Sequence, residues 1–567
     1  MAENNEGGKN QTLSGRLELT WTNKHKRLLA HEDESYEWTS PSDCRVAEVR
    51  LLHDVTTVGK VHPKKERAQD NLLIRGDALH ALTSLTRIPE FAREYAGKVR
   101  LVYIDPPFNT GQAFTNYDDA LEHSVWLTMF RDRLIQLRRL MSEDASIWVH
   151  LDDVESHRAR CVLDEVFGAE NFVANIIWQK SYTRENRTDI STSHDNIIVY
   201  AVNRPLWKKS RNLLPKSDAQ RGRYSNPDND PRGKWKPTPA HAKAEKGRRA
   251  EQFYTIVTPS GRRVDPPPGN CWRFTEERYQ EMLADKRISF GVNGDGVPSV
   301  KKFLTEVQDG LVPITIWLYQ EVGSTGTAKE EIVTLLPEVI PFSTPKPERL
   351  MQRIVEIATN EGDIVLDCFA GSGTTAAVAH KMGRRWITSE WSRDNAENYV
   401  LPRLTKVVDG SDKGGITESQ EWTGGGGFRV VEVAPSMFAV RDARIVLAPW
   451  ATDEALAEAV AAQAGFNHLP DDAPFCGRKG RQRLAVVDGL VNPDVASLLV
   501  SWLAEDEVLV VYGTAVDPDT RDALTSLRRG SQVRKVPQTI LTAYRKGASR
   551  ETMFTPPPPV VTEGEGE

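Results

Sequence analysis

Short apolar runs alternate with segments of helical periodicity along much of this chain. Runs of four to eight apolar residues predict buried strands, and apolar residues that recur every three or four positions predict helices. Strands that alternate with helices in this way predict an α/β fold with a mostly parallel sheet. Between residues 70 and 205 the expected strands lie within 71–77, 99–105, 145–152, 171–180 and 194–203, and the expected helices within 78–85, 125–141 and 157–168.

This alternation stops near Arg204 and resumes near residue 341. After the break we expect a helix in 347–359, a strand, glycine loop and helix in 363–383, and a strand in 384–390. The pattern therefore predicts one α/β domain split by an insert, followed by a smaller α/β region. The predicted division is an N-terminal extension (1–60), the first half of the domain (61–204), the insert (205–340), the second half (341–422), a C-terminal domain of unknown role (423–550) and a disordered acidic tail (551–567).

The composition is that of an ordinary globular protein. The 567 residues are 39% hydrophobic and 27% charged, and the formal net charge is −6. No run approaches the roughly 18 apolar residues of a membrane span, and the first residues lack the apolar core of a secretory signal. The cysteines form no CxxC pair, which argues against disulfides and zinc, so we expect a cytoplasmic protein without a metal. They are Cys44, Cys161, Cys271, Cys368 and Cys476.

The stretch LVYIDPPFNTG (101–111) ends a predicted strand in a rigid corner. Each proline fixes its own φ and keeps the residue before it out of the helical region, so Pro106 and Pro107 hold Asp105 and Phe108 in place. In open α/β sheets, ligands bind at the carboxyl ends of the strands. The corner is therefore either a catalytic site or a proline-stabilised turn whose acid caps the next helix.

A second dense signal is DCFAGSGTT (367–375), in which a strand runs into a glycine-rich turn and then into a helix that begins near Thr374. Glycine lets a ligand approach the backbone, and a helix N-terminus favours negative charge. The next strand ends at Glu390, near the distance at which an acid binds ribose hydroxyls in nucleotide-binding units. Asp367, the glycines and Glu390 therefore predict a site for a ribose-bearing cofactor, although a tight turn without a ligand would have a similar sequence.

The insert carries the chain's local excess of positive charge. Between Arg204 and Arg263 there are sixteen lysines and arginines against five acids, and aromatic residues are interleaved with them. Such a stretch is either a solvated surface or a surface that follows nucleic-acid phosphates. The candidates for phosphate contact are Lys208, Lys209, Arg221, Arg223, Lys234, Lys236, Arg248, Arg249, Arg262 and Arg263.

Taken together, these stretches resemble the amino-methylating DNA methyltransferases of the permuted β group. DPPF (105–108) resembles the catalytic motif of that family, and DCFAGSGTT (367–375) resembles its cofactor motif. As in the permuted β group, the catalytic motif comes first and the target-recognition insert lies between the two. NLLIRGDALHAL (71–82) resembles the cofactor-adenine motif, and STPKPERLMQRIV (343–355) resembles the helix motif before the glycine loop. Phrases within the insert, PPPGNCWRF (266–274) and GDGVPSVKKFL (294–304), resemble type III restriction–modification modification subunits.

The resemblance, which covers roughly residues 70 to 430, implies a Rossmann-like fold that uses S-adenosylmethionine and no metal. It implies that Asp105 and the Pro106 carbonyl accept the N–H bonds of a flipped adenine while Phe108 stacks on the base; the family more often has Tyr there. Asp77 and Lys346 are further candidates for binding the cofactor. Asp77 could instead be the N-cap of the next helix, and Lys346 could instead be an exposed lysine. The implied cofactor residues are Asp77, Lys346, Asp367, Phe369, Gly371, Ser372, Gly373, Thr374 and Glu390.

The resemblance thus predicts a sequence-specific adenine-N6 DNA methyltransferase of a restriction or phage-defence system. We expect the protein to bind double-stranded DNA at the nucleoid and no membrane. A homodimer and a restriction or helicase partner subunit are further possibilities. Methylation of cytosine N4 is the nearest alternative. A nucleotide-dependent oxidoreductase, suggested by GSGTTA (371–376), a non-catalytic DNA-binding regulator, and a small-RNA or protein methyltransferase also remain open.

Overall fold

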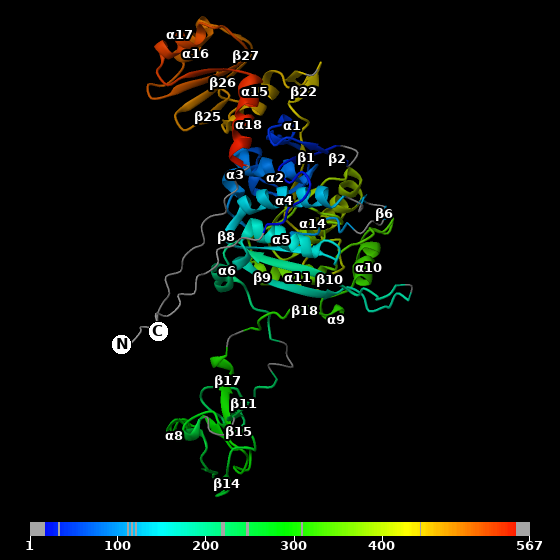
Figure 1. Cartoon of the computed structure of the whole chain (residues 1–567), viewed down its shortest axis with the longest axis vertical. Helices are drawn as coiled ribbons and strands as arrows, with labels where there is room; N and C mark the ends of the chain where they lie inside the picture. The colour runs from blue at the N-terminus through cyan, green and yellow to red at the C-terminus, as the bar shows by residue number, and fades with distance from the viewer. Residues whose placement is uncertain are drawn as a thin grey trace, which may run out of the picture. The chain divides into compact units, whose positions relative to one another are not determined.

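The structure, a computed structural model, divides the chain into two compact units (Figure 1). The first unit comprises residues up to Asn212 and from Ile314 onward, and the second is 213–313. The second unit is narrower than the predicted insert 205–340, because the flanking residues form elements that pack on the first unit. The structure describes residues 18–31, 35–109, 113–114, 117–118, 122–186, 188–216, 222–244, 249–307, 310–442 and 444–551.

A ten-stranded sheet forms the core of the first unit, with the strand order β18-β9-β10-β8-β5-β19-β20-β4-β21-β3. The strands from β8 to β21 in this order run parallel, while β10 and β3 are antiparallel to their neighbours. The mostly parallel sheet predicted from the sequence is therefore confirmed. The bounds are β3 Leu52–Gly59, β4 Asn71–Arg75, β5 Val99–Ile104, β8 Met141–Leu151, β9 Phe172–Gln179, β10 His194–Ala201, β18 Ile316–Trp317, β19 Ile364–Asp367, β20 Arg385–Glu390 and β21 Gly427–Val433.

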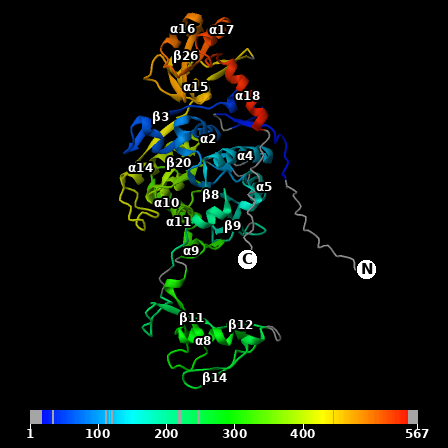
Figure 2. The same cartoon turned by 90° about the vertical axis from the view of Figure 1, so that its left-hand side faces the viewer.

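Helices cover both faces of this sheet. Figure 2 shows α4 and α5 on one side of the strands and α10, α11 and α14 on the other. The helices predicted in 78–85, 125–141, 157–168 and 347–359 are all present. The bounds are α2 Ala78–Arg87, α3 Pro89–Tyr95, α4 His123–Leu140, α5 Ser156–Phe167, α6 Arg204–Ser210, α9 Tyr319–Val322, α10 Thr325–Leu335, α11 Glu348–Ala358, α12 Thr374–Lys381, α13 Arg393–Asn395 and α14 Leu401–Asp409.

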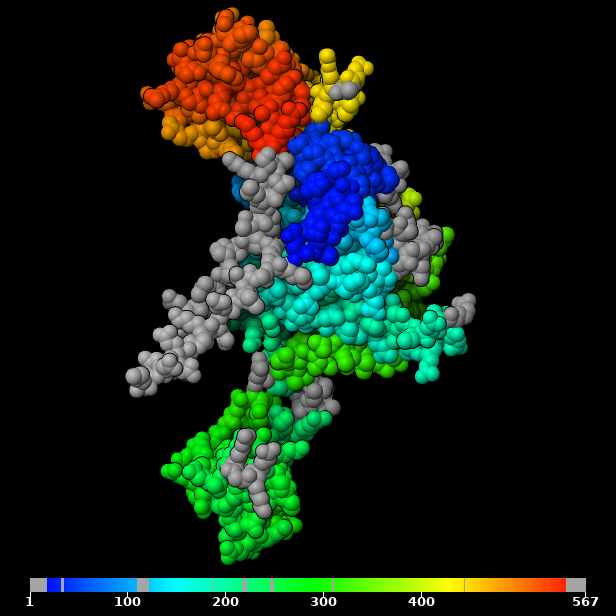
Figure 3. Space-filling model, in the orientation of Figure 1, coloured from blue at the N-terminus to red at the C-terminus, as the bar shows by residue number. Residues whose placement is uncertain are grey.

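The predicted N-terminal extension does not end at residue 60 as a separate segment. Its last strand, β3, lies at the edge of the main sheet and pairs with β21. The preceding residues form a hairpin and a short helix that lie on the surface of the first unit, as the blue segment in Figure 3 shows. The hairpin is β1 Arg27–Ala30 with β2 Tyr36–Thr39, and the helix is α1 Cys44–Ala47.

The C-terminal region is a smaller α/β module that begins after β21, which itself belongs to the main sheet. Strands β26, β27 and β28 are parallel and are joined through helices, as the predicted α/β character requires. The predicted tail, 551–567, lies outside the described residues after 551. The bounds are β22 Phe438–Arg441, β23 Arg444–Leu447, α15 Asp453–Ala464, β24 Asn467–His468, β25 Gly477–Lys479, β26 Gln482–Val491, α16 Pro493–Ser501, β27 Val508–Val516, α17 Thr520–Leu527, β28 Gln532–Lys535 and α18 Gln538–Glu551.

The second unit has its own small core, which includes Trp272, Tyr279 and Phe290. Short antiparallel sheets and the helix α8 surround this core. In neither unit do the described residues form a helix that is long and apolar enough to cross a membrane. The bounds are β11 Trp235–Pro239, β12 His241–Lys243, β13 Ile256–Val257, β14 Arg263–Val264, β15 Asn270–Trp272, α8 Glu276–Ala284, β16 Ile288–Ser289 and β17 Ser299–Phe303.

Candidate active site

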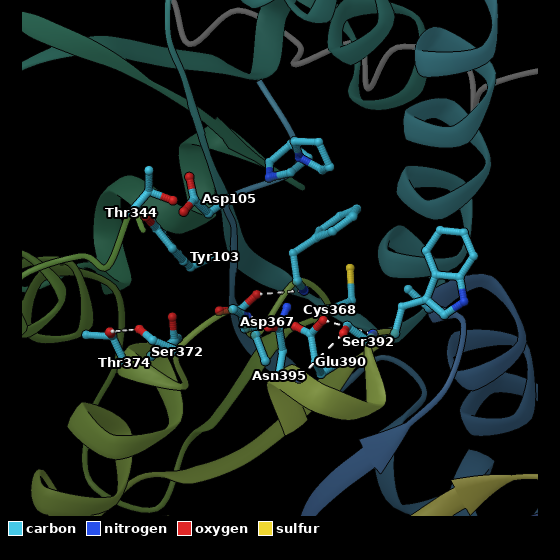
Figure 4. A pocket seen from close by; sticks show the side chains of 18 of the residues that line it. Tyr103, Asp105, Thr344, Asp367, Cys368, Ser372, Thr374, Glu390, Ser392 and Asn395 are labelled. Atoms are coloured by element: carbon cyan, nitrogen blue, oxygen red, sulfur yellow. Dashed lines mark hydrogen bonds between the residues drawn. The ribbon is translucent and has the colours of Figure 1, made fainter. Parts of the chain in front are cut away.

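Three adjacent parallel strands end at one cavity. Asp105 follows β5, Asp367 ends β19 and Glu390 ends β20, and all three side chains line one cavity (Figure 4). Because β5 pairs with β19 and β19 with β20, their carboxyl ends meet at the same edge of the sheet. The fold therefore brings together the two constellations that the sequence keeps 262 positions apart.

At the corner after β5, one side-chain oxygen of the catalytic candidate Asp105 has no hydrogen-bond partner among the described residues. Asp105 Oδ2 forms an ion pair with Lys346, whereas Asp105 Oδ1 is buried and has no hydrogen-bond partner among the described residues. The indole of Trp126 donates to the Pro107 carbonyl at 2.7 Å, and no described residue donates to the Pro106 carbonyl. One carboxylate oxygen and one carbonyl are thus left as acceptors at this corner.

Phe108 packs against a buried polar chain that the sequence did not reveal. Its ring lies 5.9 Å from that of His150, centroid to centroid, in a stacked arrangement. His150 Nδ1 lies 2.9 Å from the Tyr103 hydroxyl, and His150 Nε2 lies 3.2 Å from Asp195 Oδ2. Lys180 donates to the other oxygen of Asp195 at 2.6 Å. These partners hold the imidazole, and therefore the wall behind Phe108, in one orientation.

Burial lowers the pKa of His150, and the nearby Lys346 ammonium lowers it further, while Asp195 opposes the shift. The imidazole is therefore neutral and carries one N–H. With Nε2–H donating to Asp195, Nδ1 accepts from the Tyr103 hydroxyl, an assignment that follows from the hydrogen-bond pattern.

The glycine loop is tied to the ends of the two neighbouring strands. Glu390 accepts from the Gly371 N–H at 2.8 Å and from the Ser392 N–H at 3.1 Å, and Asp367 accepts from the Phe369 N–H at 3.0 Å. Gly371 has φ of +53°, a conformation that favours glycine. Each ionised carboxylate oxygen can accept more than one hydrogen bond, so Glu390 can still bind a ligand hydroxyl.

The local backbone and packing favour glycine at position 373. Gly373 also has a positive φ, +77°, but a Cβ atom there would lie 3.2 Å from Val400 Cγ1, and the residue does not line the cavity. The left-handed backbone and the packing thus each favour glycine here, and the expected contact of Gly373 with the cofactor stays a prediction. Ser372 and Thr374, whose hydroxyl oxygens lie 3.2 Å apart, do line the cavity.

Burial raises the pKa of Asp367 to about 8, and the carboxylates of Asp105 and Glu390 add to the shift. Asp367 is only 3% exposed. A carboxyl group with this pKa is mostly protonated at pH 7. The site therefore places a neutral acid between two carboxylates.

Asp77 and Lys346 both line the cavity, with partners of their own. Asp77 caps α2 by accepting from the backbone N–H groups of Leu79 and His80 at 3.0 and 3.2 Å, and it pairs with Arg133. Lys346 is 8% exposed, so it is not the exposed lysine of the alternative interpretation. Its ammonium also lies 5.3 Å from the centre of the Phe108 ring.

The candidates for DNA contact fall into three groups. Lys208 and Lys209 lie on α6 of the first unit and are exposed. Arg221 and Arg248 lie outside the described residues. The remaining candidates lie on the second unit, where all except the half-buried Lys236 are exposed: Arg223, Lys234, Lys236, Arg249, Arg262 and Arg263.

Two side chains of the cavity carry no signal in the sequence motifs. Tyr36 of the N-terminal hairpin and Trp391, directly after β20, face each other with ring centroids 5.3 Å apart.

Among the described residues, no cluster of His, Cys, Asp and Glu could hold a metal ion, and all five cysteines are free.

Comparisons with known proteins identify the family. The type III restriction-modification enzyme StyLTI Mod subunit of Salmonella typhimurium is 30% identical over 341 residues, which are 54% of this chain and 49% of that protein. The type II methyltransferase M.EcaI of Enterobacter cloacae is 30% identical over 300 residues, 51% of this chain and 61% of that protein. The chain thus spans about half the length of the curated relatives it matches.

The model of the DNA methylase family of N6 and N4 methyltransferases matches residues 99–399. This range contains the corner after β5, the second unit and the glycine loop. Because the match covers more than half of the chain, this protein belongs to that DNA methylase family.

Proposed function

We propose that the protein transfers a methyl group from S-adenosylmethionine to the N6 amine of an adenine flipped out of double-stranded DNA. The observation that carries the proposal is the corner at Asp105. Its Oδ1 atom is buried without a partner among the described residues, none of which donates to the Pro106 carbonyl, and both residues line the same cavity as the glycine loop. Buried acceptors without a partner are costly, so a ligand that donates two hydrogen bonds would be favoured here.

The residues of the cavity fit the cofactor. Glu390 keeps acceptor capacity for ribose hydroxyls, and Gly371, Ser372 and Thr374 lie along the cavity wall. The acidic side chains of Asp105 and Glu390 in the cavity wall suit a ligand that carries positive charge. S-adenosylmethionine, when bound, would supply an electrophilic methyl group on a cationic sulfur.

The chain's own residues would then prepare the amine. Its lone pair is delocalised into the purine ring, so the nitrogen is a weak nucleophile. Asp105 Oδ1 would accept one N–H and the Pro106 carbonyl the other, which draws the nitrogen toward tetrahedral geometry and localises the lone pair. As the nitrogen–carbon bond forms and the carbon–sulfur bond breaks, the nitrogen becomes cationic, and Asp105 is placed to receive its extra proton.

The same arrangement suits the N4 amine of cytosine, which is the second candidate. The family includes both activities, and Asp105 is the feature that favours adenine. The names of the relatives, Mod subunits of type III restriction-modification enzymes, support a modification subunit that works together with a restriction subunit. Its DNA would be that of the nucleoid. We assign recognition of the DNA sequence to the second unit, where basic residues would grip phosphates and a minority of side chains would read base edges.

The test is methyl transfer from labelled S-adenosylmethionine to DNA, followed by mass spectrometry of the nucleosides. We expect N6-methyladenine, and we expect loss of product with Asp105→Asn. Asp506→Asn, whose side chain is 71% exposed, is the matched control and should remain active. N4-methylcytosine would replace the adenine proposal, whereas no transfer with DNA of varied sequence would favour a non-catalytic DNA-binding protein.

A further inference from the structure

The N-terminal hairpin supplies one wall of the cavity. Tyr36 on β2 precedes the family-matched range 99–399 by more than 60 positions, yet its ring faces Trp391 at a centroid separation of 5.3 Å with an angle of 52° between the rings. Both side chains are half-buried and line the cavity. The cavity is therefore completed by a residue from outside the part of the chain that defines the family.

The hairpin is held in place by contacts with α4. The Trp21 indole donates to the Thr128 hydroxyl at 2.8 Å, and Arg27 forms an ion pair with Asp132. Arg133, next along the same helix, lines the cavity as Tyr36 does. The position of Tyr36 is thus fixed relative to the cavity wall and is not that of a loosely attached segment.

The cavity has two chemically different ends. Asp105 and Thr344 lie on one side in Figure 4, whereas Ser392 and Asn395 lie on the other, with Glu390 beside them. An elongated cofactor whose methyl group must reach the amine held by Asp105 extends away from that corner. Its far end then lies beyond the ribose acceptor Glu390, next to Trp391 and Tyr36.

We propose that Tyr36 and Trp391 together bind the purine ring of the cofactor, so that the N-terminal hairpin is part of the cofactor site. The inference rests on the proposed function. Aromatic faces attract a planar base through stacking, which needs no particular hydrogen-bond pattern. The far end of the cavity thus offers a base two aromatic rings, in contrast to the carboxylate and carbonyl acceptors at the Asp105 corner.

Calorimetry with S-adenosylmethionine and with adenosine, on the full chain, tests this inference. Tyr36→Ala should weaken binding of both ligands at least about fivefold, the loss expected for one stacked base. Tyr36→Phe keeps the ring and should stay within about twofold of the wild type. In steady-state methylation the Tyr36→Ala variant should raise KM for the cofactor and leave kcat at saturating cofactor unchanged.

Glu37→Ala is the matched control, because Glu37 is exposed on the same strand and does not line the cavity. Unchanged cofactor affinity in Tyr36→Ala would overturn the inference. Equal weakening in Glu37→Ala, or weakening in Tyr36→Phe together with a lower melting temperature, would also overturn it, since either would reveal a general effect on the hairpin. A wild-type chain that binds no S-adenosylmethionine would instead refute the proposed function.

Discussion

Replacing Asp367 by asparagine should change how the stability of the ligand-free protein depends on pH. Asp367 ends β19 in the centre of the sheet, is 3% exposed, and has a pKa raised to about 8 by burial and by the neighbouring carboxylates. Asparagine has nearly the same shape and is neutral at every pH, as the protonated acid is. The variant therefore keeps the packing and removes only the titration.

The sign and size follow from the two pKa values. In the unfolded chain Asp367 loses its proton near the reference pKa of 3.8, whereas in the folded chain it keeps the proton to about pH 8. Between these values the folded state binds one more proton, so the free energy of unfolding falls by about 1.4 kcal/mol for each pH unit. Over the whole interval this carboxyl group destabilises the fold by roughly 5 to 6 kcal/mol.

Urea unfolding followed by tryptophan fluorescence, from pH 5 to 9, measures this dependence. The stability of Asp367→Asn minus that of the wild type should rise by about 1.4 kcal/mol per pH unit up to about pH 8 and then level off. If the amide changes the free energy of unfolding by an amount that does not depend on pH, the plot of this difference against pH shifts but keeps its slope. Asp506→Asn should give a flat difference, and an equally flat line for Asp367→Asn would refute the raised pKa.

The remaining predictions concern the corner, the glycine loop and the second unit. Trp126→Phe loses the N–H that holds the Pro107 carbonyl, and kcat should fall roughly tenfold or more with little change in cofactor affinity, as stopped-time methylation assays would show. Gly373→Ala should lower the melting temperature, because its Cβ would crowd a packed neighbour in a left-handed conformation; an unchanged melting curve would contradict this. Neutralising Arg262 and Arg263 should weaken DNA binding for all sequences and reduce the slope of log affinity against log salt by about one unit for each phosphate that is no longer neutralised. Replacing 213–313 by the corresponding unit of a related enzyme should move methylation to another site, and a folded chimera that keeps its original site would place recognition elsewhere.

The parts of the site that could be predicted are those with local causes. An apolar run followed by two prolines, or by a glycine-rich turn, marks a strand end wherever the strand lies. Parallel strands then bring those ends to one edge, which is why Asp105, Asp367 and Glu390 meet as the sequence pattern suggests. The helices with strong periodicity were predictable because their apolar pattern is also a local feature of the sequence.

The parts that could not be predicted depend on contacts between distant residues. Lys346 reaches Asp105 across 241 positions, and Tyr36 meets Trp391 across 355. His150 lies in an apolar strand, where nothing local distinguishes it from a residue that only fills space. The insert boundary was misplaced because β18, which adds to the sheet, has only two residues and therefore no readable periodicity.

The chain enters and leaves the second unit at two points that are fixed to the first unit, so the recognition surface that we propose there could vary without a change in the cavity. Before it, Asn212 donates from its backbone to the Ile357 carbonyl at 2.9 Å and from its side chain to the Glu356 carbonyl at 3.0 Å. After it, the Thr315 carbonyl accepts from the Ile177 N–H at 2.8 Å, which starts β18 at the outer edge of the sheet. Both junctions are thus fixed to the first unit by hydrogen bonds, and β9, β10 and β8 stand between β18 and β5, the strand that Asp105 follows. Exchange of residues 213–313 would leave these bonds and the cavity intact, so a new recognition surface could be inserted at little cost to the site.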